Sequence, residues 1–353
     1  MTGGHKNDAR YRGVIPSALI MDIQAIEIFN EVVNPDFETV STLMRANWQP
    51  PCWLYEPDLL AMHINRPTAD PTMAVGLVAQ SGKLAAYLAF VPLRLRLYGE
   101  TYKAVFASFF TVSRDFRRHR LSDRQQLLML DRARSRGYDL YVAVTVAGTP
   151  ANQTVSRAFA ARNLPVRAIR NFRYLVGVAP IVASRLSVPK TTTRRYAKHD
   201  EARAFELLSQ AGLSATLAKV VEREDVDFVL HTRPRVTSYV YEEDGQVLGL
   251  LNISFLPVVS GHVGVNAYVE NMAFGSLSSS KRDDFVEATL HAVVLRGVEA
   301  IMVPDTGYVD LASFRRLGFR AAPRKLRLLL APLRDDVLAT MPEEIDSFCL
   351  DVF

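Results

Sequence analysis

The stretch Ala107–Gly137 reads ASFFTVSRDFRRHRLSDRQQLLMLDRARSRG and decides the fold. An apolar strand runs directly into a basic loop, and a helix that ends at Gly137 follows. The basic residues of this loop are Arg117, Arg118, His119 and Arg120. The N-terminus of a helix offers unpaired N–H groups and a partial positive charge, and both favour phosphate. Arginine adds a full charge and paired N–H donors. We therefore expect this stretch to hold a phosphate-bearing donor, which makes a transferase the leading interpretation.

The composition is that of a globular chain with room for two domains. The chain has 353 residues, of which 49% are hydrophobic, and this excludes a disordered protein. No apolar run is long and clean enough to span a bilayer. The segment Val14–Ile28 is interrupted by Pro16, Asp22 and Gln24, so we read it neither as a signal peptide nor as an anchor.

The net charge and the cysteines indicate which kinds of ligand and which cellular compartment to expect. The net charge of +5 is compatible with anionic ligands such as CoA or RNA. Cys52 and Cys349 are the only cysteines, and their spacing fits neither a metal site nor a disulfide framework. We therefore expect a reducing, cytoplasmic setting and no metal. The histidines form neither a metal pair nor a nucleophile triad; they are scattered at positions that include His63, His199, His231, His262 and His291.

Two segments of the chain share one pattern, offset by roughly 160 residues, which is the size of a domain. The earlier segment has predicted strands at Ala74–Ala79 and Leu84–Val91, and the later one at Ser238–Tyr241 and Val247–Phe255. Each pair is joined by a turn that contains glycine, as hairpins require. A helix closing on Arg-Gly follows in both segments, and glycine there suits the helix C-cap.

Each repeat continues with a buried strand, a short helix and a last strand. The buried strands are Leu140–Val146 and Ala300–Val303, and the last strands, which we expect to close each unit, are Arg170–Val176 and Lys325–Leu330. The pattern predicts an α/β fold with mixed sheets in two tandem domains of like topology. We place an N-terminal extension at residues 1–24, the first domain at 25–185 and the second at 186–353.

This order of elements resembles the GCN5-related N-acetyltransferase (GNAT) fold. In that family the strand before the central helix leads into a pyrophosphate loop of the form Arg/Gln-x-x-Gly-x-Gly/Ala. The matching residues here are Arg117–Ser122, with Arg120 and Ser122 in place of the two glycines.

A tandem of two such domains without those glycines is more similar to eukaryotic protein N-myristoyltransferase. The loop of that family is of an Arg-x-Lys-Arg-Val-Ala type and follows a strand that ends Asn-Phe-Leu-Cys-Val, where this chain has Ser108–Val112. The resemblance also includes Trp53–Pro57, Gly82–Leu84 and Val303–Phe319, and it extends over residues 37–330.

The resemblance implies one binding site for the donor, acyl-CoA, which serves as a co-substrate. The residues that match the CoA-binding strand and loop are Thr111, Val112, Arg117, Arg118, His119, Arg120, Leu121 and Ser122. The corresponding place in the second copy, Ser276–Arg282, is polar but lacks the arginine cluster. The second domain is therefore expected to help build the acceptor pocket, as it does in the family.

The resemblance also implies catalytic groups. Phe109 and Phe110 match the two residues whose backbone N–H groups form the oxyanion hole of the family, a role that needs no polar side chain. The alternative interpretation is two core phenylalanines. Thr145 lies on the neighbouring strand, where it could touch the acceptor or be a satisfied core hydroxyl.

An ammonium nucleophile must lose a proton before it attacks, so a general base is needed. In the myristoyltransferases the C-terminal carboxylate is the base, which corresponds to Phe353 here. Asp351, Glu270 and Asp305 are rivals. Asp305 follows a strand end, where ligand sites of α/β folds lie, whereas Glu270 lies in an apolar strand and could simply be paired.

The leading functional prediction is an N-acyltransferase. It would move an acyl group from an acyl-CoA thioester directly to an amine, which could be a small amine, an amino acid or a peptide N-terminus. The alternative is an aminoacyl-tRNA-dependent transferase, which would need a continuous basic face. The residues to check for such a face are Arg170, Arg173, Arg194, Arg195 and the loop at Arg117. A third class is a degenerate tandem that only binds.

Overall fold

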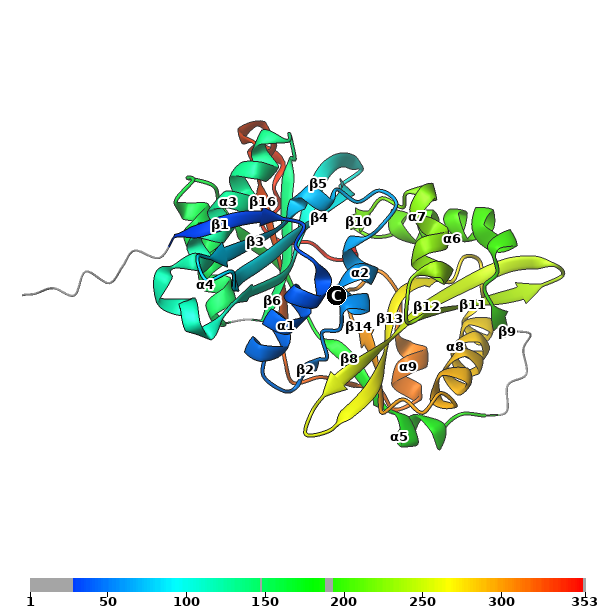
Figure 1. Ribbon diagram of the computed structural model, residues 1–353. Helices are drawn as coiled ribbons and strands as arrows, with labels where there is room; N and C mark the ends of the chain where they lie inside the picture. Colours follow the sequence, from blue (N-terminus) through cyan, green and yellow to red (C-terminus); the bar gives the residue numbers. More distant parts are fainter. Residues whose placement is uncertain (1–27, 147, 188–192, 352–353) are drawn as a thin grey trace, which may run out of the picture.

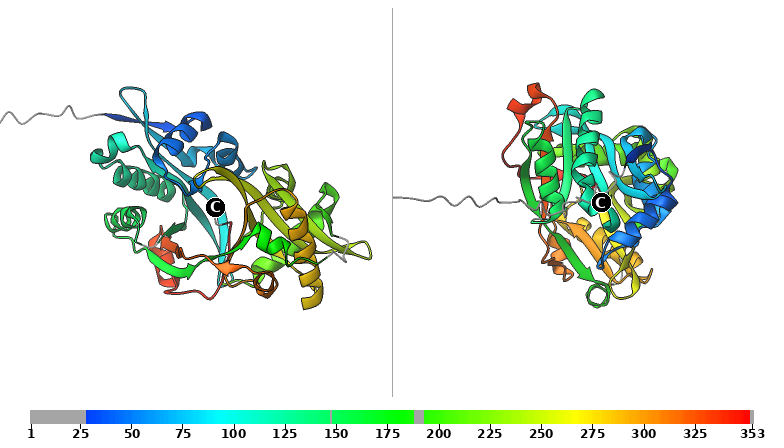
Figure 2. Two further views of the ribbon diagram at one scale, coloured as in Figure 1. Left: turned by 90° about the horizontal axis from the view of Figure 1, so that it is seen from below. Right: turned by 60° about the vertical axis from the view of Figure 1, so that its left-hand side comes forward.

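The computed structural model describes residues 28–146, 148–187 and 193–351. Two mixed β-sheets meet along one junction, with helices on their outer faces (Figure 1; Figure 2). Two helices near the N-terminus, α1 (Phe37–Asn47) and α2 (Pro57–Ile64), lie at this junction. Their apolar residues share one core with residues of both sheets, such as Phe109 and Tyr268. None of the helices in the described ranges has the length and apolar character needed to cross a membrane.

The first sheet has the strand order β1-β3-β4-β5-β6-β16-β7. These strands are β1 (Phe29–Val33), β3 (Ala74–Ala79), β4 (Leu84–Leu97), β5 (Glu100–Val112), β6 (Leu140–Val146), β16 (Leu326–Pro332) and β7 (Arg167–Phe172). Two short strands extend it beside β4, namely β10 (Leu217–Lys219) and β17 (Phe348–Cys349). The helices α3 (Leu121–Ser135) and α4 (Pro150–Ala160) cover its outer face, where Met129 and Phe159 pack on Tyr141 and other strand residues.

The second sheet has the order β15-β8-β14-β13-β12-β11-β9, and β2 (Cys52–Trp53) pairs with β12. Its strands are β15 (Arg320–Ala321), β8 (Tyr174–Val178), β14 (Ala300–Pro304), β13 (Val263–Ala273), β12 (Gln246–Val259), β11 (Val236–Glu243) and β9 (Thr193–Arg195). The helices of the described ranges that pack on it are α5 (Ala179–Ala183), α6 (Glu201–Leu213), α7 (Arg223–Asp227), α8 (Ser279–Val294) and α9 (Ala312–Arg316).

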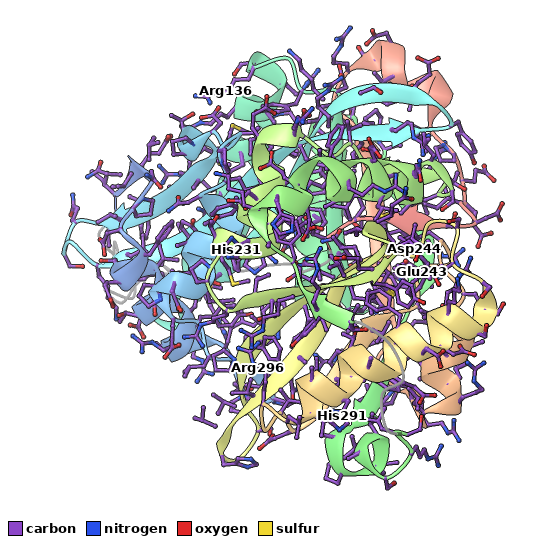
Figure 3. The ribbon with its side chains drawn as sticks, turned by 90° about the vertical axis from the view of Figure 1, so that its right-hand side faces the viewer. Arg136, His231, Glu243, Asp244, His291 and Arg296 are labelled. Atoms are coloured by element: carbon purple, nitrogen blue, oxygen red, sulfur yellow. The ribbon has the colours of Figure 1, made fainter. Side chains whose placement is uncertain are left out.

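The C-terminal end of α8 is tied to the second sheet by Arg296. Its guanidinium lies 3.8 Å from the centre of the Phe255 ring and donates a 2.6 Å hydrogen bond to Thr237 (Figure 3). A cation over an aromatic face and a side-chain hydrogen bond each add modest stability. The glycine that ends this helix, Gly297, has a φ of +73°. A positive φ is costly for other residues, which is why Arg-Gly marks the helix end in both repeats.

The mixed α/β fold and most of its elements are confirmed. The predicted strands 74–79 and 140–146 have the observed bounds, and Gly137, like Gly297, follows a helix end with positive φ. The basic loop departs from the prediction in detail, because residues Arg114–His119 form a 3₁₀ turn, η2, before α3 begins at Leu121.

The prediction that each last strand closes its own unit is wrong. The predicted strand 170–176 breaks at Arg173, so that β7 stays in the first sheet while β8 joins the second. In exchange, β16 crosses into the first sheet and lies between β6 and β7. An apolar strand pattern shows that a strand is buried, but it does not show which sheet takes it. The domain bounds at residues 185 and 186 stay a prediction, and sheet membership crosses them.

Candidate active site

A bulge in β5 shapes the centre of the site. The antiparallel ladder of β4 and β5 pairs Ala89 with Ser108 and then Tyr87 with Thr111, so Phe109 and Phe110 lie opposite the single residue between them on β4. Such a bulge takes backbone groups out of the ladder and bends the strand. On the other edge of β5, the parallel pairing with β6 ends at Ala107. The two strands therefore separate where the backbone of Phe109 and Phe110 leaves its regular pairing.

The strained backbone at Phe109 is held by its neighbours. Phe109 has a φ of +61°, which costs a non-glycine residue about 1–2 kcal/mol. The indole N–H of Trp48 donates to the Thr111 hydroxyl at 2.8 Å, and this hydroxyl donates to the carbonyl of Phe109 at 3.2 Å. The ring of Phe109 lies 5.5 Å from the His63 ring and 6.4 Å from the Tyr55 ring. The predicted binding residue Thr111 thus fixes the conformation of the bulge.

A cavity of about 650 Å³ opens beside this bulge. Phe106–Phe109 of β5 and Val144 and Val146 of β6 form one wall, and residues of the second sheet, such as Tyr268, form another. A second cavity, of about 540 Å³, shares Trp48 and Gln49 with it. The second cavity is lined on its other side by Phe110, Thr111, Val112, Arg114 and Arg117. The separated strands thus have one cavity towards the basic loop and one towards the second sheet.

The predicted phosphate-binding residues differ in exposure and in their position relative to the cavities. Arg117 is exposed and lines the smaller cavity together with Thr111 and Val112. Arg120 is 84% exposed, adopts a φ of +53° just before α3, and lies 3.5 Å from Asp123. The other members of the set have less access to the cavities: Leu121 is part of the core, Ser122 is half-buried, and the His119 ring packs 5.5 Å from Phe29. The side chain of Arg118 lies outside the described residues.

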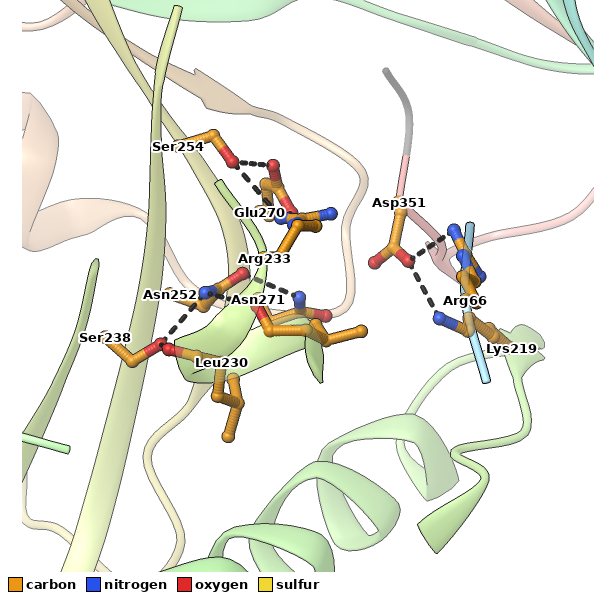
Figure 4. A network of polar contacts seen from close by, with 11 residues as sticks. Arg66, Lys219, Leu230, Arg233, Ser238, Asn252, Ser254, Glu270, Asn271 and Asp351 are labelled. Carbon is orange, nitrogen blue, oxygen red and sulfur yellow. Dashed lines mark hydrogen bonds and ion pairs between the residues drawn. The ribbon is translucent and has the colours of Figure 1, made fainter. Parts of the chain in front are cut away.

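The predicted bases are not gathered at the cavity. Glu270 is buried in β13, where it pairs with Arg233 and accepts a hydrogen bond from Ser254 (Figure 4). Asp305 pairs with Arg315 at 2.8 Å on the surface. Neither carboxylate lines the cavity. The predicted base Phe353 lies outside the described residues.

Thr145 also lies away from the cavity. Its neighbours Val144 and Val146 line the cavity wall, and successive side chains of a strand point to opposite faces. The hydroxyl of Thr145 is buried on the other face without a hydrogen-bond partner among the described residues. The sequence pattern placed Thr145 on the correct strand but could not give the face.

The C-terminal segment is held at the junction of the two sheets by a buried ion cluster. The Asp351 carboxylate lies 2.8 Å from the Lys219 ammonium and 3.4 Å from the Arg66 guanidinium (Figure 4). Burial alone would raise the pKa of Asp351, but Lys219 and Arg66 outweigh it and hold this pKa far below its usual range. A carboxylate so strongly held in its ionised form is a poor proton acceptor. Asp351 therefore fits an anchor for the chain end better than a general base.

His63 is a residue of this region for which sequence reasoning found no role. It is 4% exposed on α2, and its Nε2 atom is buried without a hydrogen-bond partner among the described residues. Burial, followed by the charges of Arg233 and Arg66, lowers the pKa of His63 to about 3, so the ring is neutral at neutral pH. It lines a cavity of about 20 Å³ together with Ser108 and Asp351, and this volume suits about one water molecule. The apolar run Leu59–Ile64 around it was the available signal of burial.

The fold has clear relatives among solved structures. N-Myristoyltransferase of Saccharomyces cerevisiae, solved with bound myristoyl-CoA, matches with a TM-score of 0.70 at 15% identity, over 86% of this chain and 78% of that chain. A GCN5-related N-acetyltransferase from Anabaena variabilis matches with a TM-score of 0.57 at 8% identity, over 87% and 73%. Another from Kribbella flavida matches with a TM-score of 0.54 at 12% identity, over 87% and 71%.

These matches show a similarity of fold. The fold of this chain is similar to that of N-myristoyltransferase and of the GCN5-related N-acetyltransferases. In this chain, β5 and β6 separate beside the bulge in β5. No protein-family model matches the sequence, and no curated protein matches it either. Within the described residues, no group of three or more histidine, cysteine, aspartate or glutamate side chains is arranged to hold a metal ion.

Proposed function

We propose that the protein is an N-acyltransferase that moves an acyl group from an acyl-CoA thioester to an amine. The observation that carries the proposal is the separation of β5 from β6 at the bulged residues Phe109 and Phe110, beside a cavity large enough for a small-molecule ligand. The likeness in fold to an N-myristoyltransferase that binds myristoyl-CoA supports the choice of donor.

In this proposal, backbone N–H groups at the bulge stabilise the transition state. The lone pair of a neutral amine forms the C–N bond, and the carbonyl electrons move to oxygen. The N–H groups of Phe109 and Phe110 donate to this oxyanion, and a donor fixed in advance is worth about 3–4 kcal/mol. The oxyanion then collapses, the C–S bond breaks, and the proton lost by nitrogen neutralises the CoA thiolate. The contacts of Trp48 and Thr111 keep the bulge in place throughout.

The direct test is calorimetric titration with acetyl-CoA, octanoyl-CoA and myristoyl-CoA, followed by an assay of thiol release with a panel of amines. Saturable binding of one of these donors, with amine-dependent release of CoA, is the expected result. An absence of binding to all three thioesters would remove the proposal and favour a degenerate tandem that binds something else.

The basic loop is proposed to hold the phosphates of the donor. We expect the double change Arg117→Ala and Arg120→Ala to raise the KM for acyl-CoA by at least about 100-fold, because each charged hydrogen bond contributes roughly 1.5–3 kcal/mol. The fold should survive, since both side chains are exposed. Thiol release measured against donor concentration checks this. Arg195→Ala is the matched control, because Arg195 is exposed on β9, far from the basic loop (Figure 1). An unchanged KM would move the donor site elsewhere.

The general base remains a proposal based on the resemblance. Among the predicted carboxylates, the terminal carboxylate of Phe353 is the choice we keep, because Glu270 and Asp305 are paired away from the cavity. Adding two glycines after Phe353 displaces this carboxylate, and we expect kcat to fall at least tenfold while acyl-CoA binding stays the same. A kcat that is insensitive to the extension would exclude the chain end as the base.

The tRNA-dependent alternative has less support from the charge distribution. Arg194 and Arg195 lie on β9, at the opposite end of the molecule from the start of α3 (Figure 1). Arg194 is neutralised by Asp200 at 2.7 Å and by Glu242 at 2.6 Å. The acidic residues Glu243 and Asp244 lie on the same end of the molecule (Figure 3). This arrangement favours a compact donor such as CoA over a long polyanion.

A further inference from the structure

The second sheet gives the main cavity an aromatic wall. The indole N–H of Trp53 donates to the Tyr268 hydroxyl at 2.9 Å, and their ring centres lie 5.7 Å apart. The Tyr174 ring lies 6.2 Å from the Tyr268 ring, and the Met302 side chain lines the same wall. These contacts hold the rings in place, so the wall is preorganised for an apolar or aromatic group. It lies across the cavity from the bulged strand, on the side where an acceptor would approach the thioester.

Among the described residues that line this cavity, Arg324 is the one that carries a charge, and none is a carboxylate. It is exposed on the segment before β16, and within the described ranges no carboxylate pairs with it. The segment is fixed at the aromatic wall, because the backbone N–H of Ala322 donates to the Tyr174 carbonyl at 2.7 Å. A guanidinium that has no carboxylate partner among the described residues is available to pair with an anion at the rim of the cavity.

The charge and the aromatic wall of the cavity favour some amine acceptors over others. A polyamine would bring further positive charges, the described residues that line the cavity include no carboxylate to pair with them, and burying an unpaired charge is costly. An acceptor that carries a carboxylate would pair it with the Arg324 guanidinium through two parallel hydrogen bonds. A peptide N-terminus offers no carboxylate so near its amine, because its first carboxyl group is an amide. The cavity volume of about 650 Å³ lies in the usual range for small molecules.

We propose that the acceptor is a free α-amino acid with a large apolar or aromatic side chain. This inference rests on the proposed acyl transfer. The side chain packs on the wall of Tyr174, Tyr268 and Met302, the carboxylate pairs with Arg324, and the amine faces the thioester at Phe109 and Phe110. The amine nitrogen forms the amide bond to the acyl carbon and CoA leaves as its thiol, so no further reactant is needed.

The test compares phenylalanine with phenethylamine, which lacks only the carboxylate, with phenylalanine amide, which replaces it by a neutral group, and with spermidine. For the wild type we expect kcat/KM for phenylalanine to exceed that for each of the other three at least tenfold. Arg324→Gln should abolish the difference between phenylalanine and phenethylamine. Arg315→Gln is the matched control, because Arg315 pairs with Asp305 outside the cavity, and it should keep the difference.

The outcomes separate this inference from the proposed function. Turnover of the other amines at the rate of phenylalanine, or a preference that survives Arg324→Gln, overturns the amino acid acceptor while leaving acyl transfer in place. Failure to bind any acyl-CoA in the titrations removes the proposed function itself. Preferred turnover of phenylalanine amide over phenylalanine would point instead to a peptide or amide acceptor and would also overturn the inference.

Discussion

Asp351→Ala is expected to lower the free energy of unfolding by about 3–5 kcal/mol, because removing one partner of a buried ion pair leaves an unpaired charge. Here two cations lose their partner at once. The side chains of Asp351, Lys219 and Arg66 are only 9%, 15% and 9% exposed. Water can therefore replace the lost carboxylate only in part. Urea denaturation followed by circular dichroism measures the effect.

A surface pair provides the control for this prediction. Asp305→Ala also removes a carboxylate from an arginine, at 2.8 Å, but the two side chains are 49% and 37% exposed. Exposed pairs contribute about 0–1 kcal/mol, so this variant should unfold close to the wild type. The double variant Lys219→Met with Asp351→Leu should recover part of the loss, because it removes opposite charges together. Equal stabilities of the two single variants would contradict a buried ion cluster.

His63→Leu is expected to make the protein more resistant to acid. The pKa of His63 is lowered to about 3 in the folded state, by burial first and then by Arg233 and Arg66. In the unfolded chain a histidine has a pKa of about 6.5. Between these two values the unfolded state binds a proton that the folded state does not. Stability therefore falls as the pH drops below about 6.5, by up to about 1.4 kcal/mol per pH unit.

The size of the acid effect follows from this difference in proton binding. Between pH 7 and pH 4.5 the wild type should lose about 2–3 kcal/mol more than His63→Leu. Above pH 4.5 the Asp351 carboxyl contributes little to the slope, since an unfolded aspartic acid titrates at about 3.9. Urea midpoints measured along a pH series check the prediction. His199→Leu is the control, because the His199 side chain is 75% exposed. Equal slopes for wild type and His63→Leu would show that His63 does not titrate on unfolding.

The sequence predicted the order of elements well because the local signals were strong. Glycines after helices, as at Gly137 and Gly297, and apolar runs such as 140–146 act within a few residues of themselves. The exchange of β8 and β16 between the sheets depends on contacts among strands far apart in the chain. Periodicity carries no information about such contacts. For the same reason the pairing of β10 with β4 was not predicted.

The sequence indicated candidate site residues along one strand and did not indicate those that come together from several segments. The bulge lies at Phe109 and Phe110, the two residues matched to the oxyanion hole. Arg324 and His63 come from segments on either side of this strand. Only the folded chain brings Arg324 to the main cavity and His63 to the small cavity of about 20 Å³. Glu270 is recognisable in the sequence as an acid in an apolar strand. Its partner Arg233 comes from the segment after α7. A charged residue in an apolar strand indicates that a partner of opposite charge is needed, but the sequence does not show which residue that partner is.

The position of β16 has a consequence for synthesis on the ribosome. This strand lies between β6 and β7, and its contact Leu326 with Val146 joins residues roughly 180 positions apart. The first sheet therefore cannot close until β16, which ends at Pro332, has left the exit tunnel. Until then β6 and β7 have an open place between them, whose edges expose unpaired backbone groups that can pair with other chains. These edges therefore stay open while the roughly 150 residues between β7 and β16 are made.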